Sequence, residues 1–155
     1  TGIAHVSGVT QIKVYAKDGQ YDLQSRVFKA MAREGISVDF INISLTGVVY
    51  TVMEEMTERA VATLNDMGYE PEIIENCAKV SAVGAGMSGV PGVTAKIVES
   101  LAIENIDILQ SADSHTTIWV LVRQQDLSAA VNALHETFRL HLEPGQEIEQ
   151  MMDQL

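Results

Sequence analysis

Hydrophobic and polar residues follow two different spacings in the first half of the chain. Residues 11–16 alternate between apolar and polar side chains, which is typical of a half-buried strand. After a loop that contains Gly19, apolar residues recur every three or four positions, which predicts a helix with one buried face. These positions are Leu23, Val27, Phe28, Met31 and Ala32.

The segment after this helix predicts a β-hairpin. Gly35 stands where the end of a helix needs a positive φ. Residues 38–43 and 47–53 are alternating or continuously apolar, and they flank a turn expected at Thr46 and Gly47.

A second helix completes the pattern. Thr57 precedes a run of apolar residues at helical spacing that ends at Gly68, and residues 71–74 begin a last strand. The order is therefore strand, helix, strand, strand, helix, strand. With both helices on one face of a mostly antiparallel sheet, this order predicts an α+β fold of the ferredoxin-like kind.

The same pattern occurs twice along the chain. A shift of 70 residues, without gaps, superimposes apolar positions of the first half on apolar positions of the second, which predicts two ferredoxin-like units in tandem. The matches include Val27 with Ile97, Met31 with Leu101, Ile36 with Ile106, Val48 with Ile118, Val52 with Val122 and Leu64 with Leu134.

The second copy has no convincing final strand after its last helix, which is expected at about residues 126–138. Residues 2–6 are strand-like and belong to no element of the first copy, so we expect them to supply the missing edge. The first unit would then be inserted into the second. The expected boundaries are 8–77 for the first unit, 2–7 with 78–143 for the second, and 144–155 for a tail without assigned function.

Charge and composition exclude several classes of protein. The chain has 10 Lys and Arg against 21 Asp and Glu, a formal net charge of −11, which disfavours nucleic acid and anionic membranes as partners. Its apolar stretches are strand-sized, so no membrane segment is expected, and no secretory signal is expected either. Thr1 in place of Met suggests a piece of a longer chain. One cysteine, Cys77, favours a reduced, cytoplasmic protein.

Two glycine-containing loops are candidate ligand sites. Residues 84–89 match G-x-G-x-x-G, but Pro91 and Gly92 follow and delay the helix to about Val93, which argues against a dinucleotide site. The equivalent loop of the first copy contains Asp18, whose carboxylate could hold the ammonium group of an amino acid while nearby amides hold its carboxylate. A solvated turn remains the alternative for each loop.

Enzymatic chemistry is the competing hypothesis. Asp113 and His115 could form an acid–base pair in a small catalyst, although the polar run 111–117 is also explained as a hairpin turn. The four histidines have no partner at a zinc-like spacing, and no phosphate-binding P-loop or nucleophile elbow is present. No cofactor or metal is therefore expected.

Three segments carry a family resemblance. Residues 80–87 (VSAVGAGM), 91–94 (PGVT) and 118–123 (IWVLVR) resemble the C-terminal regulatory part of aspartokinases, which consists of tandem ACT domains. The resemblance covers nearly the whole chain.

The resemblance implies a module without a catalytic centre that binds lysine, threonine or diaminopimelate and so inhibits an aspartate kinase. It also implies a homodimer through ACT units and a kinase catalytic domain or subunit as partner. A purely structural dimerisation module is the remaining alternative. The implied effector-binding residues are Asp18, Gly19, Gln20, Tyr21, Asn42, Ser44, Met87, Pro91, Gly92, Val93, Thr94, Ser111, Asp113, Ser114 and His115.

Overall fold

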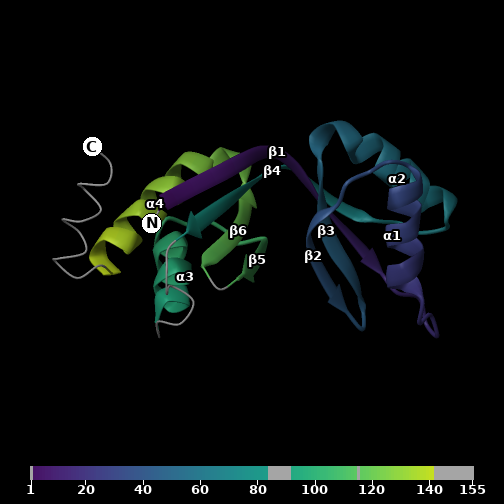
Figure 1. Ribbon diagram of the computed structural model, residues 1–155, viewed down its shortest axis with the longest axis horizontal. Helices are drawn as coiled ribbons and strands as arrows, with labels where there is room; N and C mark the ends of the chain where they lie inside the picture. The colour runs from purple at the N-terminus through teal and green to yellow at the C-terminus, as the bar shows by residue number, and fades with distance from the viewer. Residues whose placement is uncertain (1, 84–91, 115, 142–155) are drawn as a thin grey trace. The chain divides into compact units, whose positions relative to one another are not determined.

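The computed structural model describes residues 2–83, 92–114 and 116–141 (Figure 1). The chain divides into two compact units, one made of Gly8–Cys77 and the other of Thr1–Ser7 together with Ala78–Leu155. The described strands form one six-stranded sheet, and each unit contains part of this sheet and two α-helices. Two long strands, β1 (Gly2–Tyr15) and β4 (Glu72–Val83), contribute residues to both units.

The Gly8–Cys77 unit has the strand order β2-β3-β1-β4. Strand β3 pairs antiparallel with β1, from Val9 opposite Met53 to Tyr15 opposite Gly47, and with β2 on its other side. The further elements of this unit are α1 (Leu23–Arg33), β2 (Asp39–Ser44), β3 (Gly47–Met53), the short 3-10 helix η1 (Glu54–Met56) and α2 (Thr57–Asp66).

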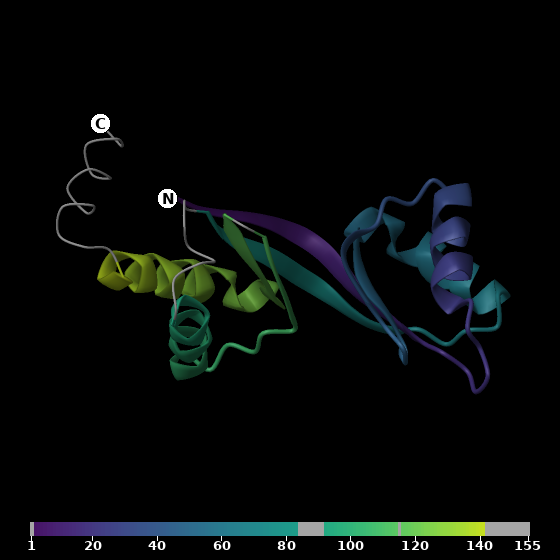
Figure 2. The same ribbon diagram turned by 60° about the horizontal axis from the view of Figure 1, so that its bottom comes forward.

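The core of this unit lies between the sheet and its two helices, and Figures 1 and 2 both show α1 and α2 against the same sheet. Alternate residues of β1 and β3 meet the apolar stripes of α1 and α2, because strand side chains alternate between faces while helical ones recur every three or four positions. The buried side chains include Ile12, Val14, Leu23, Val27, Met31, Val48, Tyr50, Val52, Ala60 and Leu64.

The second unit repeats this arrangement with the order β1-β4-β6-β5. Its elements are α3 (Val93–Ile103), β5 (Gln110–Asp113), β6 (Thr117–Arg123), the 3-10 helix η2 (Gln124–Asp126) and α4 (Leu127–His141). Its buried side chains include Val80 and six counterparts of core residues in the first unit: Ile97, Leu101, Ile118, Val120, Val122 and Leu134. The predicted α+β fold with two ferredoxin-like patterns is confirmed.

Several details of the prediction were wrong. Residues 2–6 and 11–15 lie in one continuous strand, β1, and the strand expected to begin at residues 71–74 begins at Glu72 and continues to Val83 as β4. Gly8 and Asn76 have φ values of 71° and 54°, so each takes a left-handed conformation inside a strand without ending it.

The hairpin turn lies one residue earlier than expected, at Leu45 and Thr46. Gly47 already belongs to β3, and a Cβ added there would lie 2.3 Å from the carbonyl oxygen of Val14. Glycine is therefore required for close approach of β3 to β1 and not for the turn. In the second unit, Ser111 and Asp113 lie in β5 and not in the turn predicted at 111–117.

No helix in the described ranges is both long and apolar enough to cross a lipid bilayer.

Candidate functional site

The loop between β1 and α1 is hydrogen-bonded to the segment that follows α2. The Gln20 amide N–H donates to the Lys17 carbonyl oxygen at 3.0 Å, and Lys17 Nζ donates to the Gly68 carbonyl oxygen at 2.9 Å. The same ammonium lies 5.3 Å from the centre of the Tyr69 ring, and Gln20 Nε2 donates to Tyr69 Oη. These contacts fix the loop at Lys17 and Gln20. The predicted residue Asp18 lies between them and is exposed.

A small hollow of about 70 Å³ lies beside this loop. It brings together three predicted residues, Gln20, Tyr21 and Ser44, with Gln24 donating to the Ser44 carbonyl oxygen at 3.5 Å. Ala16, Leu23 and Leu45 complete its lining. Three other predicted residues of this unit, Asp18, Gly19 and Asn42, do not line the hollow, although Asn42 lies on the same strand as Ser44.

A larger hollow of about 420 Å³ lies between α3 and the β5–β6 hairpin of the second unit. Three predicted residues line it: Thr94 from the first turn of α3, and Ser111 and Asp113 from β5. Its other lining residues are mostly apolar: Ile97, Val98, Ile108, Ala112, Ile118 and Val120. One carboxylate and two hydroxyls therefore border an apolar floor, a combination that suits a small molecule with a cationic group and an aliphatic part.

The first turn of α3 adds hydrogen-bond donors near this hollow. Gly92 precedes the helix with φ of 87°, and among the described residues no side chain caps the helix start. The first amide groups of an α-helix have no partner within the helix, and its N-terminus attracts negative charge. Thr94, in this first turn, lines the hollow, whereas Val93 is buried in the core and serves packing.

The remaining predicted residues contribute in other ways or cannot be assigned. The Ser114 amide N–H donates to the Thr117 carbonyl oxygen at 2.8 Å and closes the β5–β6 turn. Met87, Pro91 and His115 lie outside the described residues, so the proposed Asp113–His115 acid–base pair does too. Among the described residues, no three His, Cys, Asp or Glu side chains form a group that could hold a metal ion.

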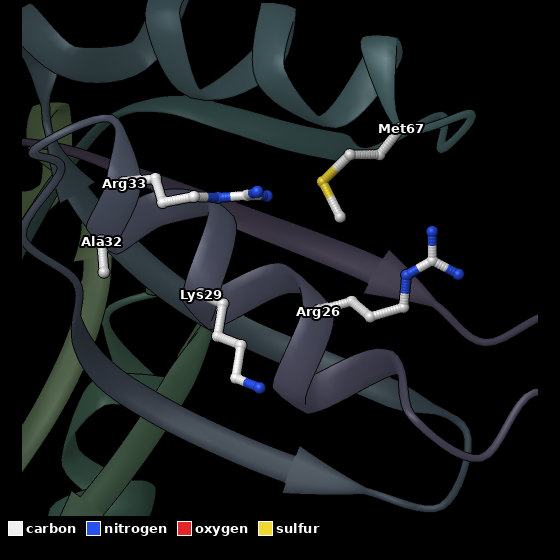
Figure 3. A pocket seen from close by; sticks show the side chains of 5 residues that line it. All are labelled: Arg26, Lys29, Ala32, Arg33 and Met67. Atoms are coloured by element: carbon white, nitrogen blue, oxygen red, sulfur yellow. The ribbon is translucent and has the colours of Figure 1, made fainter.

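The sequence analysis missed a third hollow, of about 520 Å³, in the Gly8–Cys77 unit. It is lined by Arg26, Lys29, Ala32 and Arg33 of α1 and by Met67 at the end of α2 (Figure 3). The available signal was three cations at positions i, i+3 and i+7 of a predicted helix, a spacing that a solvated helix face also shows.

Comparison with known proteins places this geometry in a family. A model of the ACT domain matches residues 72–136, from β4 into α4. The crystal structure of the ligand-free regulatory subunit of aspartate kinase from Thermus thermophilus superimposes with a TM-score of 0.80 at 30% identity, covering 88% of this chain and 96% of that one. The chain belongs to the aspartate kinase family.

Two further relatives agree with this membership of the aspartate kinase family. Aspartokinase 1 of Bacillus subtilis is 65% identical over 140 residues, which cover 90% of this chain and 35% of that protein. A crystal structure of aspartokinase alpha and beta subunits superimposes with a TM-score of 0.82 at 29% identity, covering 90% of this chain and 98% of the matched chain. The chain thus spans about a third of the length of the curated aspartokinases and corresponds to a regulatory ACT part.

Proposed function

We propose that this chain senses an end-product amino acid of the aspartate pathway (lysine, threonine or diaminopimelate) and thereby inhibits the aspartate kinase to which it belongs. Inhibition would act on the first step of lysine, threonine and methionine biosynthesis. The catalytic step would be performed by a kinase domain or subunit outside this chain. We also propose that the units Gly8–Cys77 and Thr1–Ser7 with Ala78–Leu155 are the two ACT domains.

The observation that carries this proposal is the hollow beside Asp113. An amino acid zwitterion needs an anion and a set of donors a few ångströms apart. Asp113 supplies the anion, and the backbone amides in the first turn of α3, on which Thr94 lies, supply the donors. The aliphatic side chain of the effector would lie on the apolar floor formed by residues such as Ile97 and Val120.

The sizes of these two hollows favour the second unit as the effector site. Small-molecule pockets usually measure about 300–1,000 Å³. The hollow of about 420 Å³ beside Asp113 falls in this range, whereas the hollow of about 70 Å³ beside Gln20 does not. Asp18 remains a proposed ammonium contact only if the first unit opens further or a second chain enlarges its site.

A second copy of this chain is the proposed partner in assembly. Strand β2 is the first strand in the order of the Gly8–Cys77 unit, so only one of its edges pairs with a described strand, β3. Ile41, Ile43 and Leu45 on and beside β2 are 49%, 53% and 99% exposed. Unpaired edges that carry exposed apolar side chains tend to pair with another chain.

Calorimetry of this chain with lysine, threonine and diaminopimelate tests the function and the site separately. We expect one of the three to bind, and Asp113→Asn to weaken its binding by about tenfold or more, because a charge-assisted contact is lost while the side-chain shape is kept. Asp18→Asn is the matched control. If only Asp18→Asn weakens binding, the function stands and the site lies in the first unit. If none of the three amino acids binds, the sensing function is rejected and a structural dimerisation role takes its place.

A further inference from the structure

The hollow between α1 and the end of α2 contains an unusual concentration of positive charge. Arg26, Lys29 and Arg33 are three of the 10 Lys and Arg residues in a chain with a formal net charge of −11. Their spacing of three and four residues sets them on one stripe of α1. In Figure 3, Arg26 and Arg33 extend on either side of the Met67 side chain, which comes from the end of α2.

These cations are not neutralised within the part of the chain that the structure describes. None of Arg26, Lys29 and Arg33 forms an ion pair or a side-chain hydrogen bond with another described residue, and all three are exposed. Like charges at positions i and i+4, as at Lys29 and Arg33, disfavour the helix. Arg33 gains some compensation from the C-terminal end of the helix dipole, but Arg26 does not.

The duplication provides an internal control for the requirements of the fold. At the counterpart positions, 70 residues later, α3 has Lys96, Glu99 and Ile103, and the counterpart of Met67 is Thr137. The second unit therefore forms the same helix pair with one cation where the first has three. The fold does not need the cluster, which points to a ligand.

We propose that this hollow binds a small molecule that carries two or more negative charges, either phosphates or carboxylates. Its volume of about 520 Å³ is in the range of small-molecule sites. The two guanidinium groups match the geometry of phosphate and carboxylate oxygens, to which Arg forms paired hydrogen bonds. Met67 and Ala32 give the hollow an apolar wall that suits an organic body attached to the charged groups.

This site lies in the Gly8–Cys77 unit and shares no residue with the hollow beside Asp113. It therefore adds a second ligand to the proposed amino-acid effector. Binding at Arg26 and Arg33 is expected to be unaffected by Asp113→Asn, so the two proposals can fail independently.

Isothermal titration calorimetry with three probes tests the site: pyrophosphate, citrate and magnesium-free ATP, at low ionic strength because salt screens exposed charges. We expect at least one probe to bind with a Kd below about 1 mM. Binding of pyrophosphate without citrate identifies phosphate as the recognised group, and the reverse identifies carboxylate. Tighter binding of ATP than of pyrophosphate, lost in Met67→Ala, indicates that the apolar wall takes part.

Double variants with the same net charge distinguish binding at this hollow from attraction by the overall electrostatic field of the protein. Arg26→Gln/Arg33→Gln should weaken binding of the probe about tenfold or more, whereas the control Lys13→Gln/Lys96→Gln, with the same net charge, should leave it unchanged. Arg26→Lys/Arg33→Lys keeps the charge and the fold but loses the fork geometry, so intermediate binding is expected. Equal loss in the control, or no binding of any probe at about 10 mM, overturns the proposal.

Discussion

Gly35 and Asn105, separated by 70 residues, end the first helices of the two units in the same left-handed conformation, with φ of 68° and 58°. The amide of the next residue closes each helix: Ile36 N–H donates to the Met31 carbonyl and Ile106 N–H to the Leu101 carbonyl, both at 2.9 Å. This hydrogen-bond pattern is the Schellman motif. The duplication therefore extends to single backbone angles.

The comparison of Gly35 with Asn105 predicts which substitutions are tolerated at position 35. A Cβ at Gly35 would meet no atom within 4 Å, so any cost comes from the backbone angle alone. We expect Gly35→Ala to lower the free energy of unfolding by about 1 kcal/mol and Gly35→Asn to lower it by much less, because Asn tolerates the left-handed region. Urea denaturation measures both. Equal losses for Ala and Asn would contradict the backbone explanation.

Much of this architecture follows from the sequence, because the helices bury one stripe of apolar residues. The spacing of Leu23, Val27 and Met31 placed α1 within a residue or two, and the shift of 70 transferred that pattern to α3. The apolar patterns of the strands predicted the strand boundaries less well. Gly8 and Asn76 have a positive φ within β1 and β4. In the sequence, such a residue cannot be distinguished from a glycine or asparagine that ends a strand.

Among the predicted site residues, those on regular elements also differ from those in loops. Thr94, Ser111 and Asp113 were predicted and line one hollow, because α3 and β5 are regular elements whose positions the pattern defines. Asp18 was predicted from loop chemistry, but loop side chains take directions that spacing does not specify, and it lines neither predicted site. The cations of α1 were overlooked because only the position of α2 turns a helix face into a hollow.

The buried hydroxyl of Tyr50 predicts a stabilising substitution. Its ring is fully buried and lies edge-on to Phe28, with centroids 5.5 Å apart, but its hydroxyl has no hydrogen-bond partner among the described residues. We expect Tyr50→Phe to raise the free energy of unfolding by about 1 kcal/mol, since the ring is kept and a desolvated polar group is removed. Tyr69→Phe is the matched control and should be destabilising, because the Tyr69 hydroxyl accepts a hydrogen bond from Gln20.

The same hydroxyl predicts a pH dependence. Burial raises the pKa of the Tyr50 phenol well above its usual range. Above about pH 10 the unfolded chain loses this proton while the folded chain retains it. The free energy of unfolding is therefore unaffected by this ionisation below pH 10 and falls as the pH rises above it. At pH 11 the wild-type chain should therefore have lost about 1.4 kcal/mol more than Tyr50→Phe, relative to pH 8. Parallel pH profiles of the two proteins would show that the group is not buried in solution.

Removal of residues 1–6 should affect the two units unequally. Ile3 packs against the core of the unit that contains Ala78–Leu155, and the Ala4 carbonyl accepts a hydrogen bond from Ser81 Oγ at 3.5 Å. We expect amide hydrogen exchange in residues 79–83 to accelerate about tenfold or more, while protection in α1 changes less. Unchanged protection at 79–83 would show that the N-terminal strand does not complete the second unit.

The last prediction concerns the edge of β2 as the interface of the proposed dimer. The register of β2 against β3 shifts between Asp39 and Asn42, and Phe40 takes a left-handed φ of 55°, so the regularly paired part of the strand is Asn42 to Ser44. A second chain that extends the sheet at this edge would centre on Ile43, which is 53% exposed.

Ile43→Lys should therefore weaken self-association about tenfold or more, because burial of an isoleucine side chain is lost and a Lys charge must be desolvated. Sedimentation velocity from about 1 to 100 μM measures the effect, since a weak dimer forms in this range. Ile103→Lys is the matched control: Ile103 is 70% exposed on α3 of the other unit, and its substitution should leave the dimer intact. A wild-type chain that stays monomeric throughout, or a dimer disrupted only by Ile103→Lys, excludes the β2 edge as the interface.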